Sequence, residues 1–103
     1  MKTIEQIIKE DAFTKEEVIQ SFINKEFPGF NGAKIMYCDW IDKKCFLCIC
    51  MNKKQSEIYE FHYFENKNTF KCVRIKQSGE SENVELNKEQ KDFAQKMVIT
   101  IKK

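Results

Sequence analysis

The sequence lacks the apolar runs that insert a chain into a membrane. No uninterrupted apolar stretch approaches the roughly 20 residues that a helix needs to span a bilayer. The segment Met1–Gln20 carries charges throughout and has no apolar core of the kind that marks a secretory signal peptide. Both absences predict a protein that does not contact the membrane and that remains cytoplasmic.

Glycine and arginine are scarce, and each shortage argues against a class of ligand. The chain has three glycines and neither a G-x-G-x-x-G nor a Walker sequence, so we expect no nucleotide cofactor, and indeed no cofactor of any kind. Arg74 is the sole arginine, and the net charge is only +2. Lysine cannot offer the planar fork that reads guanine edges and phosphates. Nucleic acid is therefore a possible partner, but not the favoured one.

The residues that are abundant indicate an ordinary folded domain. Among 103 residues, 42% are apolar and 33% are charged, which is the balance of one globular unit and not of a disordered chain. We expect a single α/β domain over residues 1–103. The bias toward lysine, asparagine and isoleucine is typical of an AT-rich coding sequence, as in a low-GC bacterium or its phages and mobile elements.

Helix start signals occur three times. Thr3 and Gln6 have capping-box spacing before a short isoleucine stripe, which predicts a brief first helix. Thr14 begins a T-x-x-E box, and apolar residues then recur at helical spacing, so we predict a second helix over Lys15–Lys25. Asn87 caps a third helix, with Gln90 at the reciprocal position of a capping box and an apolar stripe that reaches Ile101.

Between the second and third helices the apolar pattern has a period of two. It predicts four strands, at Lys34–Ile41, Cys45–Met51, Glu57–Glu65 and Thr69–Lys76. Short polar turns join them, which indicates an antiparallel meander. The polar segment Gln77–Glu85 is expected to be a loop. The fold class is therefore α+β, a two-layer sandwich of order α-α-β-β-β-β-α with a four-stranded antiparallel meander packed against helices.

The five cysteines raise the question of a metal site. Cys45, Cys48 and Cys50 are closely spaced, and further residues of metal-ligand type stand at Cys38, His62 and Cys72. On a strand, however, Cys45 and Cys48 point to opposite faces and cannot share a zinc ion without a bulge. We therefore expect no metal and interpret the cysteines as reduced, buried core residues.

His62, the only histidine, allows an alternative hypothesis of catalysis. A small thiol-dependent or hydrolytic enzyme would need a nucleophile beside this base, and Cys38 on the preceding part of the sheet is the candidate. No spacing of serine, aspartate and histidine supports it, so we expect no catalytic residues.

Both faces of the predicted sheet are apolar, which is unusual for a meander covered by helices on one side. A further helix could cover the second face, or that face could be a contact surface. Because aromatic residues are enriched at buried interfaces, we predict partner contacts from the sheet and from lysines in its turns. The predicted contact residues are Tyr37, Trp40, Tyr59, Phe61, Tyr63, Lys43, Lys44 and Lys67.

The sequence thus favours a non-enzymatic protein-interaction module whose partner is another protein or a second copy of itself. Its size and composition suit a small inhibitor, immunity or anti-defence protein of a phage or mobile element that acts by steric binding. The alternatives are the Cys38/His62 enzyme and a weak nucleic-acid-binding domain.

Overall fold

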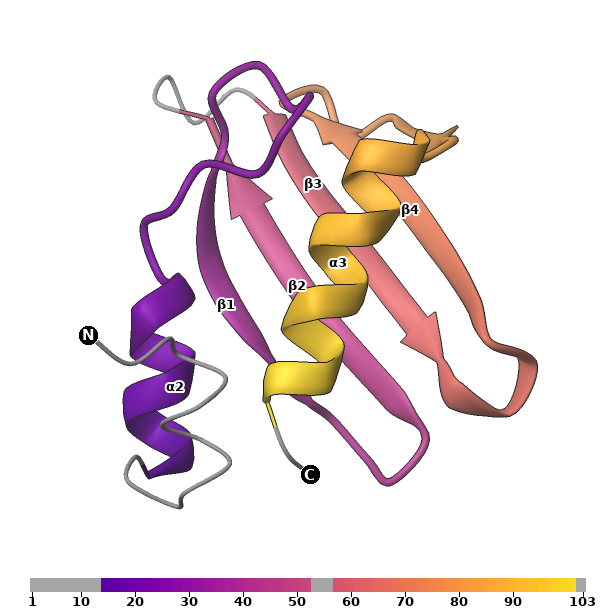
Figure 1. The fold of residues 1–103 in the computed structure, drawn as a ribbon. Coiled ribbons are helices and arrows are strands. Elements are labelled where there is room, and N and C mark those ends of the chain that lie inside the picture. The colour runs from indigo at the N-terminus through magenta and orange to yellow at the C-terminus, as the bar shows by residue number, and fades with distance from the viewer. Residues whose placement is uncertain (1–13, 53–56, 102–103) are drawn as a thin grey trace.

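An antiparallel sheet of five strands is the centre of the fold (Figure 1). The computed structural model describes residues 14–52 and 57–101. In chain order the elements are α2 (Lys15–Phe22), β1 (Lys34–Trp40), β2 (Cys45–Met51), β3 (Glu57–Phe64), a 3-10 turn (Glu65–Lys67), β4 (Thr69–Lys76), β5 (Ser81–Val84) and α3 (Lys88–Thr100). The strands are hydrogen-bonded in the order β1-β2-β3-β4-β5. The α+β class is confirmed, and the predicted first helix lies outside the described residues.

The fifth strand corrects the prediction of a four-stranded meander. Ser81–Val84 was expected to be loop, but it pairs with β4 over four residues, among them Val73 with Asn83. An ion pair between Arg74 and Glu82 joins the two strands on one face. Three of the four residues of β5 are exposed, so the strand has no apolar alternation from which it could have been predicted.

The helix α2 begins where predicted and ends three residues earlier. The backbone N–H of Glu17 donates a hydrogen bond of 3.2 Å to Thr14 Oγ1, which caps the helix. Ile23 is already extended, and Asn24 has a φ of 70°. The backbone then runs beside β1, where the N–H of Asn24 donates to the carbonyl of Ile35. Competition from this strand pairing explains why residues 23–25 do not continue the helix.

The helix α3 crosses one face of the sheet, whereas α2 lies beside β1 (Figure 1). The predicted cap is confirmed as a reciprocal capping box, in which Asn87 and Gln90 each accept a 2.9 Å bond from the other's backbone N–H. Gln90 Nε2 also donates to the carbonyl oxygen of Pro28 at 3.0 Å. This bond ties the start of α3 to the loop that precedes β1.

The core fills the space between α3 and the face of the sheet beneath it, here called the inner face. Cross-strand partners Cys38, Cys48, Phe61 and Cys72 form one row of it, each at most 2% exposed. From α3, Ala94 and Met97 are fully buried. Neither described helix combines the length and the apolar character needed to cross a bilayer.

Candidate functional site

The inner face contains three of the aromatic residues predicted to contact a partner. Tyr59, Phe61 and Tyr63 are 3%, 0% and 9% exposed, so they cannot form an accessible surface in this fold. The Tyr59 ring stacks on Phe30 with centroids 4.2 Å apart, and the Tyr63 hydroxyl donates to Asn68 Oδ1 at 2.9 Å. The prediction of an exposed tyrosine-rich face is therefore wrong. Both faces are apolar in sequence, and only the position of α3 determines which of them is covered.

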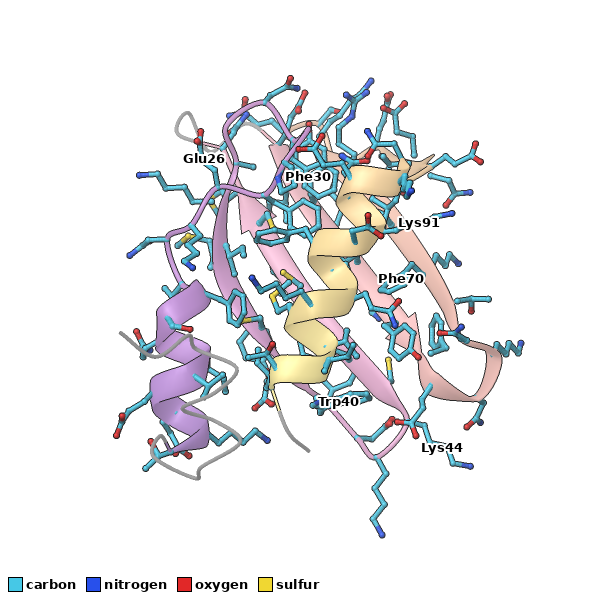
Figure 2. The ribbon with its side chains drawn as sticks, in the orientation of Figure 1. Glu26, Phe30, Trp40, Lys44, Phe70 and Lys91 are labelled. Atoms are coloured by element: carbon cyan, nitrogen blue, oxygen red, sulfur yellow. The ribbon has the colours of Figure 1, made fainter. Side chains whose placement is uncertain are left out.

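Trp40 and Tyr37, the two aromatic candidates on β1, have different surroundings. The half-buried Trp40 packs edge-on against Phe46, and its Nε1–H donates to the carbonyl of Ile101 at 2.7 Å, which holds the end of α3 (Figure 2). Tyr37 is 43% exposed. The register between β1 and β2 shifts between Ile35 and Tyr37, a β-bulge that leaves Met36 exposed as well.

The opposite face of the sheet, here called the outer face, carries the residues that alternate with the core. Neither described helix covers it, since α3 lies on the inner face and α2 contributes Val18 and Phe22 to the same core. Its half-buried aliphatic residues are Leu47, Ile49, Met51, Ile58, Val73 and Ile75. Three of them form a cross-strand row, with Met51 beside Ile58 and Ile58 beside Ile75, whereas Glu60 lies between Ile49 and Val73. The sequence reasoning missed these residues, although their shared strand parity was the available signal.

The lysines of the predicted site lie at one end of the sheet. Lys44 and Lys67 line a hollow of about 470 Å³, together with Lys71 from β4, and Asp42 and Phe64 also contribute to its wall. Lys43 is exposed in the same β1–β2 turn but does not line the hollow. Two separate turns therefore bring cationic side chains together at this end of the sheet.

A thiol, an imidazole and a carboxylate lie next to one another in a row on the outer face. Cys45 Sγ lies 3.9 Å from His62 Nδ1, and His62 Nε2 lies 2.9 Å from Glu60 Oε1. Cys45 also lines the lysine-rich hollow and is 8% exposed. Burial, and then the neighbouring charge of Asp42, raise the pKa of the Cys45 thiol. This thiol is therefore protonated at rest.

The predicted pairing of Cys38 with His62 is wrong. Cys38 is fully buried on the inner face, whereas His62 belongs to the outer face. Burial, with smaller contributions from Asp39 and Cys50, raises the pKa of Cys38 to about 12. The neighbour of His62 is Cys45, which sequence spacing alone had linked to a metal hypothesis. Among the described residues, no group of histidine, cysteine and carboxylate side chains is arranged to hold a metal ion.

The burial of the cysteines follows the prediction, with one difference in location. All five are free thiols and all are buried. Four of them, Cys38, Cys48, Cys50 and Cys72, belong to the core cluster under the helices. Cys45 alone lies on the other side of the sheet.

Comparison of the chain with protein-family models, with curated proteins and with solved structures gives no match.

Proposed function

We propose that this chain is a non-enzymatic protein-binding domain whose contact surface is the outer face of the sheet. One observation carries the proposal: six aliphatic side chains of three adjacent strands lie on a face that no described helix covers. Met51, Ile58 and Ile75 form a continuous cross-strand row on this face, and Glu60 lies between Ile49 and Val73 in the next row. Contiguous apolar surface of this kind is typical of interaction sites. The exposed Met36, Tyr37 and Ile41 extend the apolar surface at the β1 edge.

The dimensions of the outer face suit a protein partner. The four strands β1 to β4 are seven or eight residues long and β5 is four residues long. At about 3.3 Å per residue and about 4.8 Å between strands, they form the outer face. Its area is about 550 Å², to compare with the roughly 800 Å² that each partner contributes to a standard interface. The residues along the β1 edge add to this area. The face is therefore large enough for the core of a stable contact.

The charges beside the outer face favour one kind of partner. Lys44, Lys67 and Lys71 gather at one end of the face, with Asp42 as the acidic residue of the same hollow. A protein with an apolar patch flanked by carboxylates would complement both features. A small domain that covers such a patch blocks it by steric exclusion, which is the action of an inhibitor or immunity protein. That role extends the proposal and rests on the size and composition of the chain.

Two observations favour a protein over single-stranded nucleic acid as the partner. Stacking of bases requires accessible aromatic rings, and Tyr59, Phe61 and Tyr63 are buried. The outer face carries six aliphatic side chains, and its aromatic rings are the exposed Tyr37 and the half-buried Phe64, which lie on different strands. The single arginine, Arg74, is half-buried and paired with Glu82.

Two isoleucines provide a matched test of the contact surface. Ile49 is at the centre of the outer face, and Ile99 is 69% exposed on α3. A photoreactive amino acid is placed at each position in turn, and the chain is irradiated in source-cell lysate. We expect a covalent adduct with one protein from Ile49 and none from Ile99. Binding of that protein should weaken at least about tenfold in Ile49→Lys and remain unchanged in Ile99→Lys.

The remaining outcomes of this experiment count against the proposal. Equal labelling from both positions would show that the outer face has no special role. An adduct formed only with a second copy would replace the acid-flanked partner with self-association. A partner whose affinity is insensitive to Ile49→Lys would have to bind elsewhere.

A further inference from the structure

The side chains of Cys45, His62 and Glu60 together have the parts of an activated thiol. In such sites a base lies beside the nucleophile, and a third group orients the base. Here the three side chains come from two paired strands, with His62 opposite Leu47 and Glu60 opposite Ile49. Strand pairing therefore fixes their spacing. Phe64 stacks on the imidazole with ring centroids 6.0 Å apart and restrains it further.

Glu60 determines which imidazole nitrogen faces the thiol as an acceptor. A carboxylate only accepts hydrogen bonds, so at 2.9 Å from Glu60 Oε1 the Nε2 atom carries the proton and donates it. When the ring carries only this proton, the lone pair of Nδ1 faces Cys45 Sγ at 3.9 Å. The thiol hydrogen can also reach the carbonyl of Phe46, at 3.9 Å, by rotation about the Cβ–Sγ bond. His62 is thus placed to take the proton as the sulfur reacts.

The other four cysteines have no such arrangement. Burial raises the pKa of Cys38 and of Cys72 to about 12. The pKa of Cys48 is also raised well above its ordinary value by burial, and its Sγ lies 3.8 Å from that of Cys50. All four lie in the core cluster. Cys45 is the cysteine that borders both a base and a hollow.

The hollow beside Cys45 indicates the class of substrate. Its volume of about 470 Å³ is within the range of small-molecule sites. Lys44, Lys67 and Lys71 outnumber Asp42 in its wall, so it favours an anion. Phe64 gives it an apolar side. A small molecule with carboxylate groups and a short apolar portion suits these walls.

The backbone around Cys45 favours attack on sulfur over attack on a carbonyl carbon. Acyl transfer needs N–H donors aimed at a developing oxyanion. The N–H groups of Lys44 and Cys45 both already donate to Asp42 Oδ1, at 2.7 and 2.8 Å. Attack on a disulfide produces no oxyanion, because the charge leaves on the departing sulfur.

We propose that Cys45 is an exchange site for small anionic disulfides, with His62 as its base and the hollow lined by Lys44, Lys67 and Lys71 as the binding site. The Cys45 sulfur attacks one sulfur of the disulfide, and a new S–S bond forms as the old one breaks. The electron pair of the broken bond leaves with the other half of the disulfide. That half takes up the proton that His62 removed from Cys45, so one disulfide and one thiol yield a mixed disulfide and a free small thiol. The inference does not depend on the proposed function.

Glutathione disulfide is a suitable probe because it carries several carboxylates. The full chain is incubated with it at neutral pH and sampled over time by intact-mass and peptide mass spectrometry. We expect the addition of one glutathione moiety per chain, on Cys45. Cys45→Ser should abolish the adduct, and His62→Gln, which can keep a bond to Glu60, should slow its formation at least about tenfold.

A neutral disulfide tests the role of the hollow. Replacing Lys44, Lys67 and Lys71 together by glutamine should slow the reaction with glutathione disulfide several-fold and leave that with hydroxyethyl disulfide unchanged. Lys43→Gln is the matched control, because Lys43 does not line the hollow. Circular dichroism verifies the fold of each variant. Adducts spread over several cysteines, unaltered rates in His62→Gln, or a folded chain inert at Cys45 while the denatured chain reacts would each overturn the inference.

Discussion

Strand alternation decides the environment of each cysteine in β2. Cys48 and Cys50 share the parity of Phe46 and belong to the core, whereas Cys45 has the opposite parity and faces His62. The sequence allowed the prediction that the cysteines are buried thiols, because they occur in an apolar β pattern. It could not pair Cys45 with His62, since that contact depends on the register between β2 and β3. The Cys38 hypothesis failed for the same reason.

The buried thiols predict a loss of stability at alkaline pH. The pKa values of Cys38 and Cys72 rise from 9.0 to about 12 on burial. The unfolded chain ionises first, so the stability that these thiols support is complete below pH 9 and falls as the pH rises toward 12. Each should remove about 1.4 kcal/mol from the free energy of unfolding per pH unit within this window.

Urea unfolding at about pH 8 and about pH 10 measures this loss. The control is Cys72→Ala, which is less stable at both values but lacks one titrating thiol, so its decrease between them should be smaller by about 1.4 kcal/mol. An equal decrease in both proteins would mean that Cys72 contributes nothing to the pH dependence. The other titratable side chains are common to the two proteins, so the comparison isolates the contribution of Cys72.

At the scale of elements, the sequence predicted the features that depend on residues close together in the chain. The bounds of β2 and β4 match the prediction, because apolar residues alternate between turns. The capping box of α3 was also predicted correctly. β5 was missed because backbone pairing with β4, not burial of its own side chains, creates it. α2 was predicted too long because the competing partner of residues 24–26 is β1, which is distant in sequence.

The loop before β1 contains a glycine that the start of α3 requires. Gly29 has a φ of +77°, and a Cβ placed there would lie 2.5 Å from Gln90 Nε2. Gly79 has a φ of +92° with nothing within 4 Å. Gly79→Ala should therefore cost about 1–2 kcal/mol of backbone strain alone. Gly29→Ala should cost about 1 kcal/mol more, because it displaces the bond from Gln90 to Pro28.

Chemical denaturation of the two alanine variants checks this difference. A third variant, Gln90→Ala, removes the side chain that would clash, and the further change Gly29→Ala should then cost no more than Gly79→Ala. If Gly29→Ala and Gly79→Ala are equally destabilising in the native background, the contact with Gln90 does not contribute to the loss of stability in Gly29→Ala.

At the scale of the whole molecule, the choice of covered face is the property that the sequence leaves open. Both parities of the strand β2 are apolar, so this strand alone does not decide which face meets α3. The outcome depends on how α3 docks through Met97 and Ala94, and on the anchor from Trp40 to Ile101. The docking of α3 on this face buries Tyr59, Phe61 and Tyr63 and leaves the aliphatic residues on the other face. That Lys44 and Lys67 lie close together was predictable, because an antiparallel meander places the β1–β2 turn and the β3–β4 turn at the same end of the sheet.

Stability should decrease across the sheet from its centre to β5. β2 and β3 are paired on both sides, whereas β5 is four residues long, mostly exposed, and paired only with β4. Hydrogen exchange should therefore protect the paired amides of β2 and β3 at least about a hundredfold more than those of β5. Protection of β5 equal to that of β3 would show that the sheet opens as one cooperative unit.

The bulge in β1 and the shortness of β5 also bear on aggregation. An exposed sheet edge can recruit strands of other chains and grow into a fibril. At the β1 edge, residues 24–26 already occupy the start of the strand, and the shift at Met36 breaks the regular ladder beyond it. At the other edge, β5 offers four residues, among them Glu82, as a template. Within the described residues, both edges of the sheet are therefore poor templates for the addition of a strand from another chain.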